Sequence, residues 1–190
     1  LARLEGDKRP GILHHPFLLD ADAPAEGENV VEMLVRKYGR EPFDMWDRIE
    51  TEAHNSGLEL DMRKQNMRYP SQMAQVFIQA AAHKGTQHPL ALAFSHACYV
   101  DAKNISDPEV IREIAKQHGF TDAEVDGLLA AEEPPGQIEA AAAQAAQSGV
   151  SGVPFFIFNN KFAVSGAQPE AVFDEALGMA ARGEVPEAAQ

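Results

Sequence analysis

The chain has 190 residues, a formal net charge of −13 and a single cysteine, Cys98. Affinity for nucleic acid comes mainly from Lys and Arg side chains that meet phosphates, so this acidic balance argues against a nucleic-acid partner. No stretch approaches the ~20 consecutive apolar residues that span a bilayer, which argues against a membrane protein. A single cysteine cannot form an intramolecular disulfide. The composition therefore indicates one globular domain, or one domain that carries a sizeable insertion.

The sequence begins at Leu1 rather than at Met, which indicates that the chain is processed or that residues precede it. A signal peptide would lie in such a preceding part. One cysteine fits a reducing compartment without requiring one, so we expect a cytoplasmic protein and leave secretion open.

The predicted elements start with a helix end over residues 1–6 and a strand over residues 11–19, in which Pro16 favours a sheet edge or a bulge. An acidic loop follows, and apolar residues then recur at helical spacing for more than a hundred residues. Residues 58–62 alternate like a short isolated strand. The helices expected in this region run over residues 31–38, 42–54, 71–81, 88–102, 107–119, 121–131 and 137–148. Their boundaries rest on local signals, which are Asp107 before Pro108, a capping box of Thr121 with Glu124, and the two prolines at 134 and 135.

The periodicity changes after Gly149. Residues 153–158 (VPFFIF) predict a short buried strand, Asn159-Asn160 a hairpin turn, residues 162–164 the return strand and residues 172–180 a closing helix. Neither an early strand nor a late hairpin buries its apolar face alone, so we expect both in one sheet. The expected class is α/β, with residues 1–27 and 136–190 as the core and residues 28–135 as a helical insertion.

The segment Gly149 to Pro169 (GVSGVPFFIFNNKFAVSGAQP) resembles the C-terminal half of the thioredoxin fold of DsbA-family thiol–disulfide oxidoreductases, in particular the FrnE-like branch. Residues 16–30 (PFLLDADAPAEGENV) and 99–111 (YVDAKNISDPEVI) are also similar to that family, so the resemblance covers nearly the whole chain. It implies a thioredoxin-like core interrupted by a large all-helical insertion domain.

The resemblance also implies a mechanism. A Cys-x-x-Cys pair at the start of the first helix supplies a thiolate, which attacks a disulfide through a mixed-disulfide intermediate. By the family pattern, Val153 and Pro154 form the cis-proline loop that binds substrate as an added strand. The implied substrate is a disulfide-containing protein or a small thiol, with no cofactor, although glutathione could be a co-substrate. The first strand and the Cys-x-x-Cys turn have no counterpart here, so we expect the nucleophilic cysteine upstream of Leu1, in a segment of about 20–35 residues.

Two other functions stay open. The related 2-hydroxychromene-2-carboxylate isomerases and kappa-class glutathione transferases bind glutathione at the same proline loop and use a serine in place of the first cysteine. Their tryptophan-containing WGQDR-like segment is replaced by VSGAQP here, which argues against this branch. A redox-inactive relative that binds peptides through the cis-proline edge is the other alternative.

Other candidate residues have simpler structural explanations. Cys98 lies on an apolar helical face with Leu90 and Phe94, where cysteine behaves as a small hydrophobe. His14 and His15 would point to opposite faces of a strand and so could not bind one metal ion together. We expect no metal site, no calcium loop, no serine nucleophile and no aromatic ligand box from the remaining candidates, which are His83, His88, His96, Asp20, Asp22, Ser151, Trp46, Phe77 and Phe94.

Overall fold

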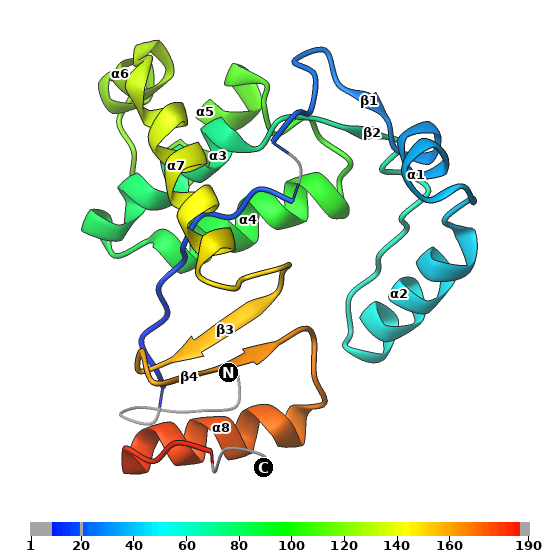
Figure 1. Cartoon of the computed structure of the whole chain (residues 1–190). Helices are drawn as coiled ribbons and strands as arrows, with labels where there is room; N and C mark the ends of the chain where they lie inside the picture. The colour runs from blue at the N-terminus through cyan, green and yellow to red at the C-terminus, as the bar shows by residue number, and fades with distance from the viewer. Residues whose placement is uncertain (1–8, 20, 187–190) are drawn as a thin grey trace. The chain divides into compact units, whose positions relative to one another are not determined.

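The structure is a computed structural model that describes residues 9–19 and 21–186. The chain divides into two compact units, Leu1–Ala141 and Ala142–Gln190 (Figure 1). The predicted helix end over residues 1–6 lies outside the described residues. The elements in chain order are β1 (Glu28–Asn29), α1 (Val30–Tyr38), α2 (Phe43–Asn55), β2 (Met67–Arg68), α3 (Gln72–Ala80), the 3-10 helix η2 (Ala81–Lys84), α4 (Gln87–Tyr99), α5 (Pro108–Gln117), α6 (Asp122–Ala130), α7 (Glu133–Gln147), β3 (Phe155–Phe158), β4 (Phe162–Ser165) and α8 (Glu170–Arg182).

The helices of the first unit begin where the sequence places capping residues. The Asp107 carboxylate accepts a hydrogen bond from the Glu109 amide at 2.9 Å, next to Pro108 in the first turn of α5. Thr121 and Glu124 form the complete capping box of α6. Such caps satisfy amides that have no partner within the helix.

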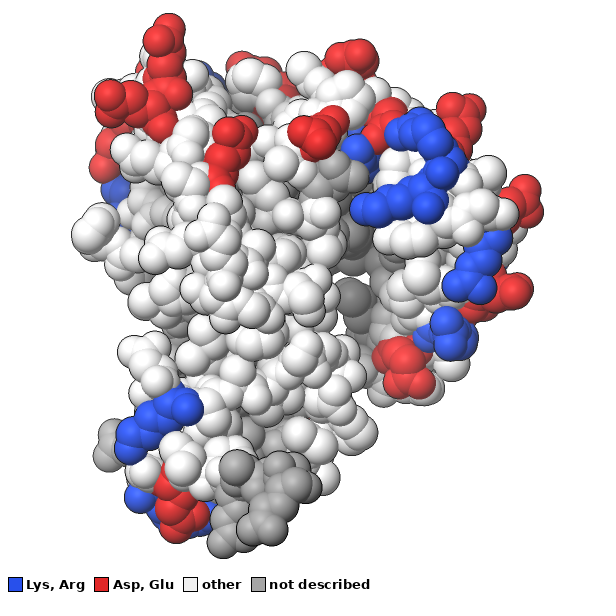
Figure 2. All heavy atoms as spheres, in the orientation of Figure 1, with Lys and Arg blue, Asp and Glu red and all other residues white. Residues whose placement is uncertain are grey.

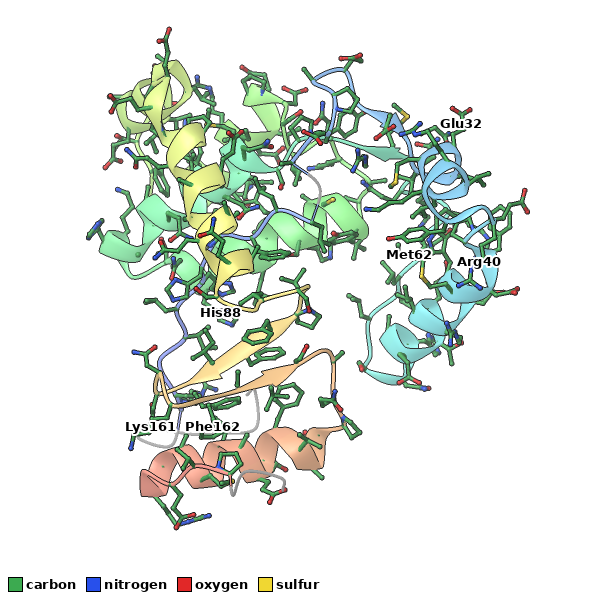
Figure 3. The ribbon with its side chains drawn as sticks, viewed as in Figure 1. Glu32, Arg40, Met62, His88, Lys161 and Phe162 are labelled. Atoms are coloured by element: carbon green, nitrogen blue, oxygen red, sulfur yellow. The ribbon has the colours of Figure 1, made fainter. Side chains whose placement is uncertain are left out.

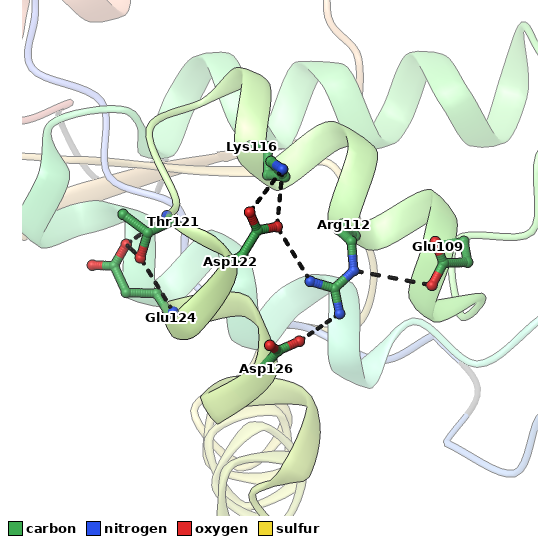
Figure 4. Close-up of polar contacts among 7 residues, drawn as sticks. All are labelled: Glu109, Arg112, Lys116, Thr121, Asp122, Glu124 and Asp126. Carbon is green, nitrogen blue, oxygen red and sulfur yellow. Dashed lines mark hydrogen bonds and ion pairs between the residues drawn. The ribbon is translucent and has the colours of Figure 1, made fainter.

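A network of ion pairs joins α5 to α6 (Figure 4). The Arg112 guanidinium contacts the carboxylates of Asp122 and Asp126 at 3.5 and 2.5 Å. Lys116 reaches Asp122 at 2.9 Å. These groups are open to solvent, which screens their charges, so the ion pairs add little to the stability of the fold.

The hydrophobic core of the first unit lies among α3, η2, α4, α5 and α6. Its largest fully buried side chains are Phe77, Leu90, Ile111 and Val125. Full burial of such a side chain contributes about 1.5–3 kcal/mol each. Phe94, at 2% exposure, belongs to the same cluster. Trp46 is also buried, at 3% exposure, which agrees with its predicted structural role.

The two prolines at 134 and 135 separate α6 from α7. Both lie in the first turn of α7, where a missing amide N–H costs no intrahelical hydrogen bond. The prediction that this sequence ends one helix before the Ala-rich helix begins is therefore confirmed.

Residues 30–66, which include α1 and α2, lie between the strands β1 and β2 in the sequence, and these strands form a short antiparallel pair. Glu28 links β1 to α1 and to β2, because its carboxylate binds Arg36 at 2.7 Å and the Arg68 Nε at 2.7 Å. Acidic and basic side chains lie next to each other over α1 and α2 (Figure 2). The sequence did not predict this two-residue ladder, and the possible strand over residues 58–62 does not form.

The predicted strand over residues 11–19 is wrong: the segment is extended, yet it has no strand partner among the described residues. Exposure still alternates in it, with residues 11, 13 and 15 exposed and residues 12, 14 and 16 covered. Its backbone is bound by glutamine side chains instead of a neighbouring strand. Gln87 of α4 accepts from the His14 amide at 3.0 Å and donates to the His14 carbonyl at 3.1 Å.

The second unit is a β-hairpin with one helix on it. The two sheets of the described chain, β1–β2 and β3–β4, each contain two strands. The prediction that the early segment and the hairpin share strands of one sheet is therefore not met in the described residues. The proposed boundaries at residues 28 and 135 stay a prediction. No helix of the described residues is long and apolar enough to cross a membrane.

Candidate functional site

The site predicted at Val153 and Pro154 lies at the open end of the β3–β4 hairpin. The peptide bond between the two residues is cis. The Gly166 amide donates to the Pro154 carbonyl at 2.8 Å, and Phe155 then faces Ser165 in the antiparallel register. Peptide groups of successive strand residues point to alternate edges. Phe155 and Ile157 therefore direct theirs to the edge away from β4, and Val153 lies at the start of that edge.

No strand of the described residues pairs with this outer edge of β3. Val153 is 49% exposed and Ile157 is 55% exposed. An unpaired edge with exposed apolar side chains is a template for an added strand. The expectation that residues 153–158 form a buried strand is thus right about the strand and wrong about its burial.

The closed end of the hairpin is fixed by α8. Asn159 and Asn160 have positive φ values of 50° and 55°, as in a type I′ turn, and together with Lys161 they form the loop between the paired residues Phe158 and Phe162. The Asn159 amide donates to the Ala180 carbonyl at 2.9 Å, and the Lys161 ammonium donates to the Gly183 carbonyl at 2.9 Å. These carbonyls belong to the C-terminal end of α8, where a cation is favourable. Lys161 and Phe162 are labelled at this turn in Figure 3.

One face of the β3–β4 hairpin also packs against α8. Phe156 meets Phe173 of α8 edge to face, with ring centroids 4.8 Å apart. Phe158 and Phe162 stack on each other across the two strands, at 5.2 Å. Aromatic pairs of this kind add about 0.5–1.5 kcal/mol beyond their buried area. The hairpin that follows the loop at Val153 and Pro154 is thus bound to α8 both at its turn and along one face.

Cys98 lies on α4 and has a different environment from a catalytic thiol. Burial raises the pKa of its thiol to about 11. The Gln65 amide lies 3.5 Å from its sulfur as a hydrogen-bond donor. Only the thiolate is nucleophilic, and at neutral pH this thiol is almost entirely protonated. The expectation that Cys98 is structural agrees with this environment.

The remaining candidates do not come together as a site. No group of three or more His, Cys, Asp or Glu side chains that could hold a metal ion occurs in residues 9–19 and 21–186. Asp20 lies outside the described residues. Ser151 is exposed in the loop before Val153.

One polar pair was missed by the sequence analysis. The His14 Nε2 lies 2.9 Å from the His88 Nδ1, and the two rings stack with centroids 5.2 Å apart. His88 is at the N-terminal end of α4 (Figure 3). The alternation in residues 11–16 could have placed His14 on the covered face, but nothing in the sequence identifies a partner 74 residues away.

The hairpin with its cis-proline loop and closing helix, after a long helical region, defines a thioredoxin-like α/β protein with a large helical insertion. The model of the DSBA-like thioredoxin domain matches residues 5–178, so the chain belongs to that family. The fold is similar to the crystal structure of a probable DsbA oxidoreductase from Streptomyces coelicolor, with a TM-score of 0.79 and 28% sequence identity. That match covers 94% of this chain and 78% of the other chain. A comparison with curated proteins found no match.

Proposed function

We propose that this chain is the substrate-binding part of a DsbA-family thiol–disulfide oxidoreductase of the FrnE-like branch. The observation that carries the proposal is the exposed Val153 beside Pro154, just before β3, in a chain of this family. An extended peptide or a small disulfide such as oxidised glutathione would lie beside Pro154. Its peptide groups would bind those of Val153 as an added strand.

The redox step needs a thiolate that the described site does not contain. A thiolate attacks one sulfur of the substrate disulfide, a mixed disulfide forms, and the other substrate sulfur leaves as a thiolate. A second cysteine of the enzyme then attacks the mixed disulfide, so the enzyme is oxidised and the substrate reduced, or the reverse. The raised pKa of Cys98 makes this residue unsuitable. We therefore retain the proposal that both cysteines lie upstream of Leu1, with no cofactor and with glutathione as a possible co-substrate.

The test is disulfide exchange by the full-length protein as its gene encodes it. Reduction of insulin and of oxidised glutathione by dithiothreitol would be followed for the wild type and three variants. Cys98→Ser should keep the activity. Val153→Asp should raise KM about tenfold or more, because it places a charge on the edge that binds substrate. Leu92→Asp is the matched control, since Leu92 is exposed to a similar extent, at 56%, on α4.

Two outcomes would overturn this proposal. Activity that disappears in Cys98→Ser would place the nucleophile on α4 instead. An absence of turnover in the full-length wild type, together with binding of an extended peptide that Val153→Asp weakens, would favour the redox-inactive alternative.

A further inference from the structure

Residues 9–19 lie extended against α3 and α4 and are held there by the side-chain amides of three glutamines. Gln75 accepts from the Phe17 amide and donates to the Phe17 carbonyl, both at 3.0 Å. Gln87 binds both backbone groups of His14, and Gln79 donates to the same carbonyl at 2.9 Å. None of these amide groups ionises, so these attachments do not change with pH.

The His14–His88 pair joins this segment to α4 through two titratable side chains. Its 2.9 Å contact is a normal N–H···N hydrogen bond when one nitrogen carries a proton and the other does not. The pair keeps this bond when it is neutral and when it carries one additional proton. A second additional proton puts hydrogen on both facing nitrogens, which removes the acceptor and sets two positive charges against each other.

Neither α3 nor the first turn of α4 supplies an acidic side chain that could compensate for that second charge. Residues 72–80 of α3 contain no titratable side chain, and the first turn of α4 contains no acidic one. His88 is itself in that first turn, where the positive end of the helix dipole disfavours a cation. The charged groups that act on His14 are His88 and the exposed His15, and together with burial, which is the largest cause, they lower the pKa of His14 below 6.5.

We propose that the His14–His88 pair is a proton-operated latch, which holds residues 9–19 on α3 and α4 near neutral pH and releases them when both rings are protonated. The sign follows from the lowered pKa of His14. The attached state binds fewer protons than the released state, so attachment is strongest above pH 6.5 and weakens as the pH falls below it. The change ends once the pH is below the pKa of His14 in the attached state. This latch is independent of the proposed redox function.

The experiment is hydrogen–deuterium exchange of the full-length protein at pH 7.5 and pH 5.0, corrected for the intrinsic pH dependence of amide exchange. Protection of the backbone amides in residues 12–17 should fall by up to about tenfold for each unit by which attachment lowers the pKa of His14. Amides of α4 and α5 should keep their protection, which separates local release from acid unfolding. Unchanged protection of residues 12–17 at pH 5.0 would overturn the proposal.

Variants test the pair itself. His88→Gln keeps a side chain that can hydrogen-bond to His14 and removes one charge, so residues 12–17 should stay protected at pH 5.0. His83→Gln is the matched control, an exposed histidine of η2, and should release like the wild type. If His88→Gln loosens the segment at both pH values, NMR titration of the His14 and His88 rings in the wild type decides whether the pair is a latch. Two coupled steps that become a single step in His14→Gln support the latch, whereas two independent steps refute it.

Discussion

Substitution of Gln87 by Met tests the observation that a glutamine replaces a neighbouring strand. Gln87 is 5% exposed, and its amide makes both a donated and an accepted hydrogen bond with His14. Methionine fills a similar volume but leaves the His14 amide without its acceptor, while the His14 carbonyl still receives Gln79. The lost hydrogen bond costs about 1 kcal/mol, and the stranded amide about 1 kcal/mol more, at the low end of its range because His14 is only half-buried.

A loss of about 2 kcal/mol corresponds to about 30-fold faster exchange of the amides in residues 12–17. Native-state hydrogen exchange at pH 7.5 measures this, since the pKa of His14 is lowered from 6.5 and its ring is then neutral. Gln72→Met is the matched control, because the Gln72 amide makes a single exposed bond of 3.3 Å to the Ala21 carbonyl. Its effect should stay within about 0.5 kcal/mol. Equal effects of the two substitutions would refute the strand-like role of Gln87.

Three further predictions concern stability and reactivity. Gly27→Ala should destabilise by about 2 kcal/mol or more in urea unfolding, because its φ is 79° and a Cβ would lie 2.5 Å from the Tyr69 ring. Gly57→Ala, with the same φ but open space, should cost about 1 kcal/mol. A lysine ammonium and a capping threonine lower the pKa of Glu124 to about 2, so its contribution to stability is present above pH 4.5 and is lost as the pH falls through about 2. Glu124→Gln should flatten acid unfolding in that window, as monitored by circular dichroism. Cys98 should react with iodoacetamide about 100-fold more slowly at pH 7.5 than an unperturbed thiol, by mass spectrometry, since its pKa is raised from 9.0 to about 11.

The parts of the fold that were predicted correctly depend on neighbours in the sequence. Asp107 and Thr121 mark the starts of α5 and α6 because a cap bonds an amide two or three residues further on. Asn159-Asn160 marks the hairpin because both residues take positive φ within the turn itself. Each signal and its structural consequence lie within four residues, so a local pattern contains the whole interaction.

The predictions that failed depend on partners that are far away in the sequence. The alternation in residues 11–16 indicates an extended chain correctly, but whether that chain is a strand depends on what meets its backbone. The side-chain amides of Gln75 and Gln87 bind this backbone, and these residues are 58 and 73 positions away from their partners in the sequence. Similarly, the apolar run in β3 predicts a buried strand, whereas Ile157 faces outward because α8 covers one face of the hairpin.

The loop at Val153 and Pro154 was predicted from the family resemblance, and its environment was not predicted. The turn, the strand register and the Gly166 contact to Pro154 follow from residues close together in the hairpin. The contacts of Asn159 and Lys161 with the C-terminal end of α8 span 21 and 22 residues, so no local pattern indicates them. In both units, side-chain amides or an ammonium group thus form hydrogen bonds with backbone groups of residues far away in the sequence. Because glutamine, asparagine and lysine are ordinary surface residues, no periodicity distinguishes those that hold a segment in place from those that face solvent.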